Sequence, residues 1–197
     1  MAEQDRRKWD RKFSEMPDLL APRPPGELVV SWCGEGRGKR ALDLACGGGR
    51  HTRYLSERGY RVDAVDISAV ALDRLRPEVD HDRVRLIEAD LDAFTPQSAC
   101  YDLIVMTNYL DRALIARAQE GLKADGIFIV ETYMNDPENE KKDSNPDYLL
   151  APCELKSLFS EGFSILEYRE FWNETYEKYR MKKQAIAARK TTTKESV

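Results

Sequence analysis

The sequence predicts an α/β protein built around a doubly wound, largely parallel sheet. Short apolar runs alternate with helical segments from residue 40 onward, which is the pattern that parallel sheets produce. Three consecutive glycines, Gly47–Gly49, directly follow the first of these runs, where such sheets bind their ligands. The chain has 197 residues, a length that suits one domain or two small ones.

The first 38 residues are polar and rich in proline and glycine. Helices are predicted over 5–14 and 25–33. The second helix starts at Pro25, because the fixed φ of proline suits the first helical position. We therefore expect an N-terminal helical arm over residues 1–38 and a main domain over residues 39–197.

The main domain opens with five predicted strands. Buried parallel strands appear as continuous apolar runs, and such runs occupy residues 41–45, 60–65, 84–87, 103–106 and 127–130. A turn at Asp125–Gly126 precedes the last of them. Helices are predicted over 50–58, 69–76 and 112–122. Gly59 is placed to end the helix over 50–58, and Ser68 and Asp111 are placed to cap the helices over 69–76 and 112–122.

The end of the chain breaks the simple alternation. Residues 133–150 lack periodicity and predict a long loop, and Pro152 opens a short helix that Gly162 ends. Two strands are predicted near 163–170 and 181–189. The gap of about ten residues between them is too short for a crossover helix. We therefore expect an antiparallel final pair, with one of these strands reversed in the sheet.

Composition excludes several classes of protein. Charged residues make up 34% of the chain, and no apolar run approaches the roughly 20 residues that a membrane span needs. The ends are basic, whereas residues 13–175 carry a net charge of −11, so binding to nucleic acid is not expected. The four cysteines lack a CxxC pair and the two histidines are not spaced as ligands, which argues against a metal site. We expect reduced thiols and a cytoplasmic location.

Acidic residues stand at the ends of the first three predicted strands. Asp43 lies inside the first strand, Asp66 ends the second and Asp90 follows the third. An acid at the second strand end can accept hydrogen bonds from the vicinal hydroxyls of a ribose. A dinucleotide site is disfavoured, because Thr52 stands where the third glycine of G-x-G-x-x-G belongs. The strand ends therefore predict a nucleoside pocket.

These residues resemble the class I S-adenosylmethionine-dependent methyltransferases. The family's first motif is D/E-x-G-x-G-x-G, and here Asp43-Leu44-Ala45-Cys46-Gly47-Gly48-Gly49 has alanine in place of the first glycine. The likeness covers residues 40–190. It implies a Rossmann-like, seven-stranded mixed sheet of order 3-2-1-4-5-7-6, with one antiparallel strand and helices on both faces. It also implies S-adenosylmethionine as cofactor and S-adenosylhomocysteine as product.

The resemblance implies roles for particular residues. The glycine loop would pass under the methionine moiety, and Asp43 would orient its amino group. Asp66 would hold the ribose, and Ile67 would lie against the adenine. The full set of cofactor-binding residues implied is Asp43, Ala45, Cys46, Gly47, Gly49, Asp66, Ile67, Asp90, Leu91, Thr107 and Asn108.

Within the class, the chain most resembles small-molecule methyltransferases of the tellurite-resistance and thiol type. This likeness rests on residues 9–13, on residues 148–152 and on the absence of insertions. It implies an arm that closes over the cofactor through Trp9, Lys12 and Phe13. The alternative is that Trp9 and Phe13 only fasten a helix to the body.

The acceptor is expected to be a small molecule, methylated by in-line displacement. A thiolate or chalcogen oxyanion would need no strong base, whereas an amine or a hydroxyl would. Candidate catalytic residues are His51, Tyr109 and Tyr133. Two other functions stay open, namely a non-catalytic cofactor-binding module that acts through a partner and a nucleic-acid methyltransferase. The sequence does not indicate the oligomeric state.

Overall fold

A computed structural model describes residues 2–34, 39–175 and 177–192. Its strands are β1 (Arg40–Leu44), β2 (Arg61–Asp66), β3 (Val84–Glu88), β4 (Tyr101–Thr107), β5 (Leu122–Tyr133), β6 (Phe163–Trp172) and β7 (Lys182–Lys190). Within the described residues these strands form one seven-stranded sheet of order β3-β2-β1-β4-β5-β7-β6. The pairings among β1 to β5 are parallel, and β7 is antiparallel to both β5 and β6. The predicted strand order and the reversed strand are both confirmed.

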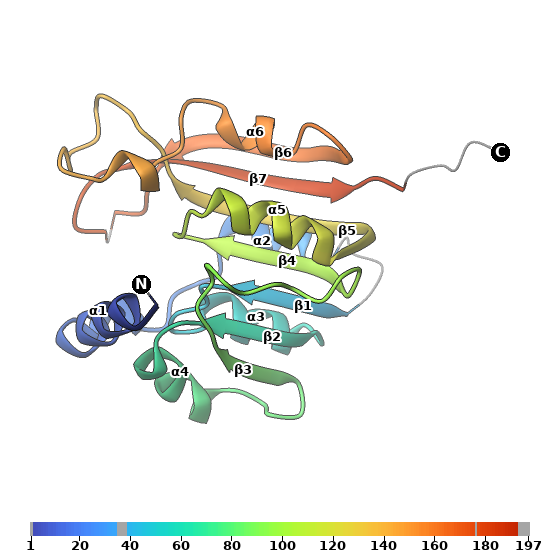
Figure 1. Ribbon diagram of the computed structural model, residues 1–197, viewed down its shortest axis with the longest axis horizontal. Coiled ribbons are helices and arrows are strands. Elements are labelled where there is room, and N and C mark those ends of the chain that lie inside the picture. The colour runs from blue at the N-terminus through green and yellow to red at the C-terminus, as the bar shows by residue number, and fades with distance from the viewer. Residues whose placement is uncertain (1, 35–38, 176, 193–197) are drawn as a thin grey trace.

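Helices cover both faces of the sheet (Figure 1). They are α1 (Ala2–Glu15), α2 (Glu27–Trp32), α3 (Arg50–Glu57), α4 (Ala69–Leu75), α5 (Arg112–Gly121) and α6 (Glu154–Leu158), with short 3-10 turns η1 (Pro17–Leu20), η2 (Arg76–Glu78) and η3 (Pro146–Tyr148). Residues of α5 and α6 form one core with the sheet, and residues of α2, α3 and α4 form a second core on its other face. The sheet is therefore buried from both sides, as expected for doubly wound proteins.

The alternation of side chains along the strands determines where the acidic residues point. Successive side chains of a strand face opposite sides of the sheet. In β4, Met106 belongs to the core beneath α5, whereas Val105 belongs to the core beneath α3. Ala41 of β1 is also in the α3 core, and Asp43 lies two residues further on. The Asp43 carboxylate is therefore directed toward α3.

Several predicted boundaries differ from the structure. The first helix begins at Ala2 rather than at residue 5, and α6 begins at Glu154 rather than at Pro152. The fifth strand begins at Leu122 rather than at residue 127, and its pairing with β4 skips from Leu122 to Ile127. Asp125 has a left-handed backbone with φ of 62°, so Asp125–Gly126 is a bulge within β5 and not a turn before it. The helix predicted over 25–33 is shorter, because the chain becomes helical only from Glu27.

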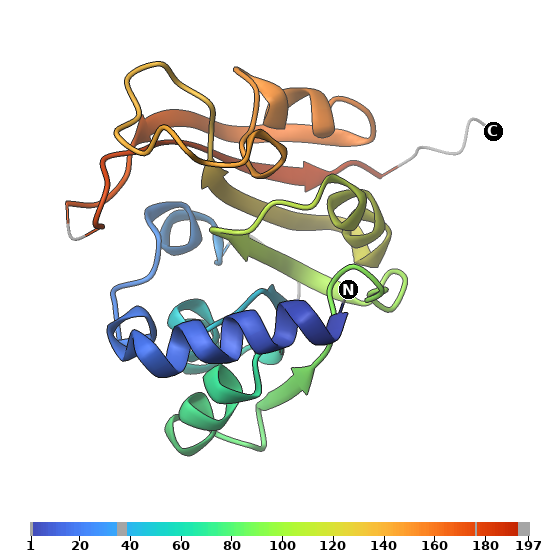
Figure 2. The same ribbon diagram turned by 60° about the vertical axis from the view of Figure 1, so that its left-hand side comes forward.

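Helix α1 lies across the carboxyl ends of the central strands. The arrowheads of β1, β2 and β4 in Figure 1 point toward the side that α1 occupies, and Figure 2 shows α1 with α4 beside it. None of its described side chains, those of residues 3–15, is buried. The partly covered ones are Asp5, Arg6, Trp9, Asp10 and Phe13, which share one helix face. This helix therefore contacts the body along a single stripe.

The rest of the arm is attached more firmly. Leu28 and Val29 of α2 are buried against the sheet, and Leu20 of η1 is buried as well. By packing, α2 belongs to the body of the molecule. Residues 35–38, at the end of the predicted arm, and residues 193–197 of the basic tail lie outside the described residues. Among the described residues, no helix has both the length and the apolar character needed to cross a bilayer.

Candidate functional site

The three glycines after β1 have three different surroundings. Gly47 has φ of 51°, and nothing lies within 4 Å of the place that a Cβ would take. A Cβ on Gly48 would come within 2.8 Å of the Leu20 carbonyl oxygen, so this glycine lets η1 pack on the loop. Gly49 has φ of 75°, and a Cβ there would overlap Leu75 of α4. Only Gly47 therefore leaves the loop backbone open for the close approach of a ligand.

Asp43 is fully enclosed beneath this loop. One of its carboxylate oxygens accepts a hydrogen bond of 2.6 Å from the Thr52 hydroxyl on α3. Burial raises the pKa of Asp43 to about 7, and the nearby Asp66 acts in the same direction, although the hydrogen bonds from Thr52 oppose both. A cationic ligand group beside Asp43 would favour its ionised form. Thr52, which replaces the third glycine of a dinucleotide motif, thus fixes the orientation of Asp43.

Asp66 connects the glycine loop to the turn after β2. Its two oxygens accept backbone hydrogen bonds from Gly47, at 2.8 Å, and from Ser68, at 2.9 Å. Burial raises the pKa of Asp66, while these backbone hydrogen bonds lower it. Each carboxylate oxygen has a further lone pair, so Asp66 retains capacity to accept from hydroxyl groups of a ligand.

A cavity of about 180 Å³ lies between α1 and the ends of β2 and β3. It brings together Ile67 and Asp90, two of the predicted residues, with Glu3 and Arg6 of α1. Glu3 and Arg6 could not be predicted from the sequence, because their place depends on how α1 crosses the strand ends. The predicted residue Leu91 is only 5% exposed and packs in the α5 core.

His51 lies at the start of α3 and is 3% exposed. Its Nε2 accepts a hydrogen bond from the Gly26 backbone at 3.1 Å, so in the neutral ring Nδ1 carries the proton. That nitrogen lies 3.5 Å from the hydroxyl oxygen of Thr107 at the end of β4. Burial, with a smaller contribution from Arg50, lowers the pKa of His51 from 6.5 to about 3. His51 is therefore neutral at physiological pH and holds Gly26 beside the end of β4.

A buried ion network lies where the end of β5 meets the start of β7. The side chain of Lys183 is fully buried, and its Nζ lies 3.3 Å from Glu131, 2.9 Å from Glu177 and 3.4 Å from Glu174. Tyr133 donates a hydrogen bond to Glu177, and Glu174 also pairs with Arg50 at 3.0 Å. The network thus fastens the β6–β7 connection to β5 and α3.

Sequence analysis missed this network except for Tyr133. Glu131 lies 52 residues before Lys183 and is brought beside it by the register of β5 with β7, where Tyr133 pairs with Lys183. Lys183 occupies a buried position of β7, and a lysine inside a strand indicates that carboxylates surround it. Burial, followed by Glu177, raises the pKa of Tyr133.

Two of the three candidate catalytic residues lie close to one network, because the place that a Cβ on Gly26 would take is 3.4 Å from His51 and 3.5 Å from Glu131. Burial raises the pKa of Tyr109, and so do Asp111, Asp92 and Asp90, which places Tyr109 on the Asp90 side of the strand ends. His51 lies with Gly26, and Tyr133 lies in the Lys183 network. The remaining predicted residues surround the loop: Ala45 has φ of 55°, Cys46 is buried, and Asn108 is exposed with φ of 57°.

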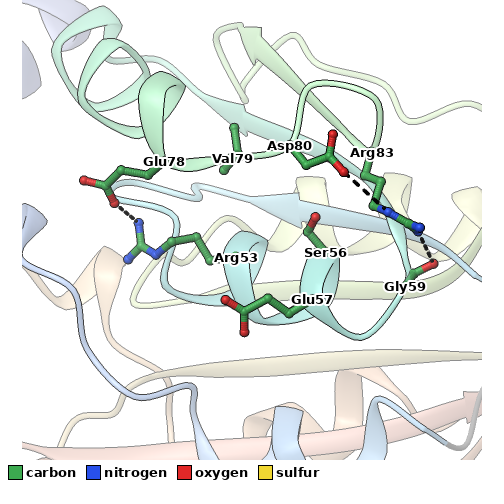
Figure 3. A pocket seen from close by; sticks show the side chains of 8 residues that line it. All are labelled: Arg53, Ser56, Glu57, Gly59, Glu78, Val79, Asp80 and Arg83. Carbon is green, nitrogen blue, oxygen red and sulfur yellow. Dashed lines mark hydrogen bonds and ion pairs between the residues drawn. The ribbon is translucent and has the colours of Figure 1, made fainter.

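A second cavity, of about 350 Å³, lies beside α3 near the starts of β2 and β3 (Figure 3). Four of its five charged side chains pair with one another, Arg53 with Glu78 at 2.9 Å and Arg83 with Asp80 at 3.5 Å. None of the predicted site residues lines it. The candidate site is therefore the edge of the sheet that α1 covers.

Comparison with known proteins identifies the family. Residues 41–138, about half of the chain, match the model of a methyltransferase domain. The chain belongs to the class I S-adenosylmethionine-dependent methyltransferases. The matched segment contains the glycine loop, Asp66 and the ends of β3, β4 and β5, which are the elements that the resemblance singled out.

Individual relatives of this methyltransferase are distant. Malonyl-acyl-carrier-protein O-methyltransferase from Pectobacterium atrosepticum is 31% identical over 81 residues, which span 41% of this chain and 31% of the relative. TehB from Haemophilus influenzae has a TM-score of 0.74 at 24% identity, over 92% of this chain and 67% of that one. The cyclase SpnF has a TM-score of 0.73 at 16% identity, over 98% and 97%. At these identities the two structures establish the fold alone.

S-adenosylmethionine, the cofactor of the family, fits the residues present. Three features lie side by side at the carboxyl ends of the neighbouring strands β1, β2 and β3. They are the open backbone of Gly47, the carboxylate of Asp66 and the cavity beside Ile67 and Asp90. Asp66 accepts hydrogen bonds as a carboxylate, and a ligand that carries a sulfonium and an ammonium group would favour the ionised form of Asp43 as well. The site of this methyltransferase is therefore suited to a cationic nucleoside.

Replacing Gly48 with alanine should release η1 from the loop. The added Cβ would lie 2.8 Å from a backbone atom of Leu20 that cannot rotate away. Overpacking of this kind costs about 1–3 kcal/mol, which corresponds to roughly 10-fold faster trypsin cleavage of the arm. Gly34→Ala is the matched control, because nothing lies within 4 Å of its Cβ position. Equal cleavage rates for both variants would contradict the close approach.

Replacing His51 with glutamine should reduce the sensitivity of the fold to acid. The folded pKa of His51 is about 3 against 6.5 ordinarily, so the unfolded chain binds the proton first and stability falls as the pH drops from 6.5 toward 3. The loss is about 1.4 kcal/mol per pH unit over this window. Glutamine keeps an acceptor for the Gly26 amide and does not titrate.

Urea unfolding between pH 7 and pH 4 measures this effect. Asp43 acts in the opposite direction, because its raised pKa adds stability as the pH falls below 7. It is present in both proteins, so the difference between wild type and variant isolates His51. Parallel curves for the two proteins would show that folded His51 accepts a proton without penalty.

Proposed function

We propose that the chain transfers a methyl group from S-adenosylmethionine to a small-molecule acceptor. The observation that carries the proposal is the edge formed by Gly47, Asp66 and the cavity beneath α1. In the proposed complex Asp66 binds the ribose, Ile67 and Asp90 bind the adenine, and Asp43 faces the amino group. We place this activity in the cytoplasm, since the cysteines among the described residues are free thiols.

The cofactor supplies a methyl group already activated by positive charge on sulfur. The residues of the chain bind and orient this donor and keep water away, because in-line displacement depends on alignment. The structure provides rigid support for that task. His51 fixes the segment around Gly26, and the Lys183 network fixes the β6–β7 connection. Both lie near the ends of β4 and β5, where we place the acceptor.

The three candidate catalytic residues favour an acceptor that needs no strong base, such as a thiolate or a chalcogen oxyanion. His51 has a pKa of about 3, and its Nε2 is occupied by the Gly26 amide. Tyr109 and Tyr133 both have raised pKa values, so neither is ionised at neutral pH. An acceptor that is already anionic would react without help from any of the three.

The two alternatives have less support. A nucleic-acid methyltransferase would use both basic ends of the chain to bind one nucleic acid. The two ends lie on opposite sides of the molecule, because α1 is at the carboxyl ends of the central strands and the antiparallel strand β7 ends at the other edge. This arrangement disfavours that alternative. A non-catalytic module that binds the cofactor and acts through a partner would use the same edge of Gly47, Asp66 and the cavity beneath α1. Only an assay of methyl transfer distinguishes this alternative from the proposal.

A transfer assay tests the proposed activity. The protein is incubated with S-adenosylmethionine labelled in its methyl group and with thiols, selenite or tellurite, and with amines for comparison. We expect S-adenosylhomocysteine and a labelled product with thiols or chalcogen oxyanions. Binding of the cofactor with no transfer to any acceptor would favour the non-catalytic module.

Replacing Asp66 with alanine should weaken binding of S-adenosylhomocysteine. Loss of a hydrogen bond to a charged group costs about 1–3 kcal/mol, and the change also frees the Gly47 amide. Titration calorimetry measures the affinity, and circular dichroism checks the fold. Asp82→Ala is the control, because Asp82 is exposed beyond the far end of β2. Unchanged affinity in a folded Asp66 variant would place the ribose elsewhere.

A further inference from the structure

Helix α1 covers the candidate cavity but is attached to the body by few groups. Glu3 and Arg6 line the cavity, yet no described side chain of α1 is buried. Arg6 and Arg7 both pair with Glu3 within the helix itself. Among the described residues, Asp10 is the residue of α1 whose side chain hydrogen-bonds to the body. The position of α1 over the cavity therefore rests on its stripe of partly covered side chains and on the hydrogen bonds of one carboxylate.

Asp10 binds the turn that also holds Asp66. Its Oδ1 accepts hydrogen bonds from the Ser68 hydroxyl at 2.7 Å and from the Val70 amide at 3.3 Å. Ser68 is fully buried, and its own amide donates to Asp66 at 2.9 Å. Asp66 in turn accepts from the Gly47 amide at 2.8 Å. A continuous chain of hydrogen bonds thus joins α1 to the glycine loop.

We propose that Asp10 is a positioning residue that couples closure of α1 to binding of the cofactor at Asp66. The inference rests on the proposed function, since it requires a nucleoside between α1 and the strand ends. Asp10 keeps α1 over the cavity and keeps Ser68 in the orientation that supports Asp66. A ligand in the cavity then contacts Glu3 and Arg6 of α1 on one side and Ile67 at the end of β2 on the other, and these are the two elements that the Asp10–Ser68 hydrogen bond joins.

Thermodynamic linkage makes the coupling reciprocal. If Asp10 strengthens cofactor binding by a given factor, the bound cofactor must strengthen closure of α1 by the same factor. A residue that only caps the start of α4 would behave differently. It would change the stability of the fold and leave the affinity for the cofactor unaltered.

The test compares Asp10→Ala, Asp10→Asn and the control Glu15→Ala. Asparagine retains an oxygen that can accept from Ser68 and Val70, and Glu15 is an exposed residue of the same helix. Calorimetry gives the affinity for S-adenosylhomocysteine. Trypsin cleavage at the basic residues of α1, with and without saturating ligand, gives the protection that the ligand confers. Thermal unfolding checks that each variant is folded.

We expect Asp10→Ala to weaken binding about 10-fold, as loss of a charge-assisted hydrogen bond would. Ligand protection of α1 should fall by the same factor, Asp10→Asn should bind within about 3-fold of wild type, and Glu15→Ala should match wild type. If wild type binds and Asp10→Ala binds equally well, the coupling is wrong and Asp10 only caps α4. If wild type itself binds no S-adenosylhomocysteine, the proposed function fails and the coupling with it.

Discussion

The buried carboxylate of Asp66 is the constraint on which the candidate site depends. It accepts hydrogen bonds from the backbone of Gly47 and of Ser68, and so it fixes the glycine loop after β1 relative to the turn after β2. Parallel pairing of β1 with β2 brings these two ends to one edge of the sheet. The same turn receives α1 through Asp10, so the loop, the turn and the covering helix are set by one group of contacts.

The acceptor side is organised by a different interaction. Lys183 is fully enclosed among Glu131, Glu174 and Glu177, and the desolvation of such an ion is compensated only by close opposite charges. The network orders the connection between β6 and β7. In the proposed function, the site combines a cofactor edge, defined by backbone amides and carboxylates, with an acceptor edge whose elements are joined by ion pairs. Such a site would promote the reaction by aligning the reactants rather than by acid–base chemistry.

Much of this was predictable from the sequence, because it depends on local patterns. Apolar runs and glycines located the central strands and the loop, and the short gap before residue 181 predicted the reversed strand. The bulge at Asp125 was not predictable, since its sequence also suits a turn. The Lys183 network depends on the register of β5 with β7, and the position of Glu3 and Arg6 depends on the path of α1 over the strand ends. Neither long-range arrangement leaves a periodic signal in the chain.

A crystal structure of the protein with S-adenosylhomocysteine is the most direct test of the central claim. We predict that the ribose hydroxyls bind Asp66, that the adenine lies between Ile67 and Asp90, and that α1 stays over the cavity with Asp10 bound to Ser68. A nucleoside bound away from Asp66, or in the cavity beside Arg53 and Glu78, would contradict the account.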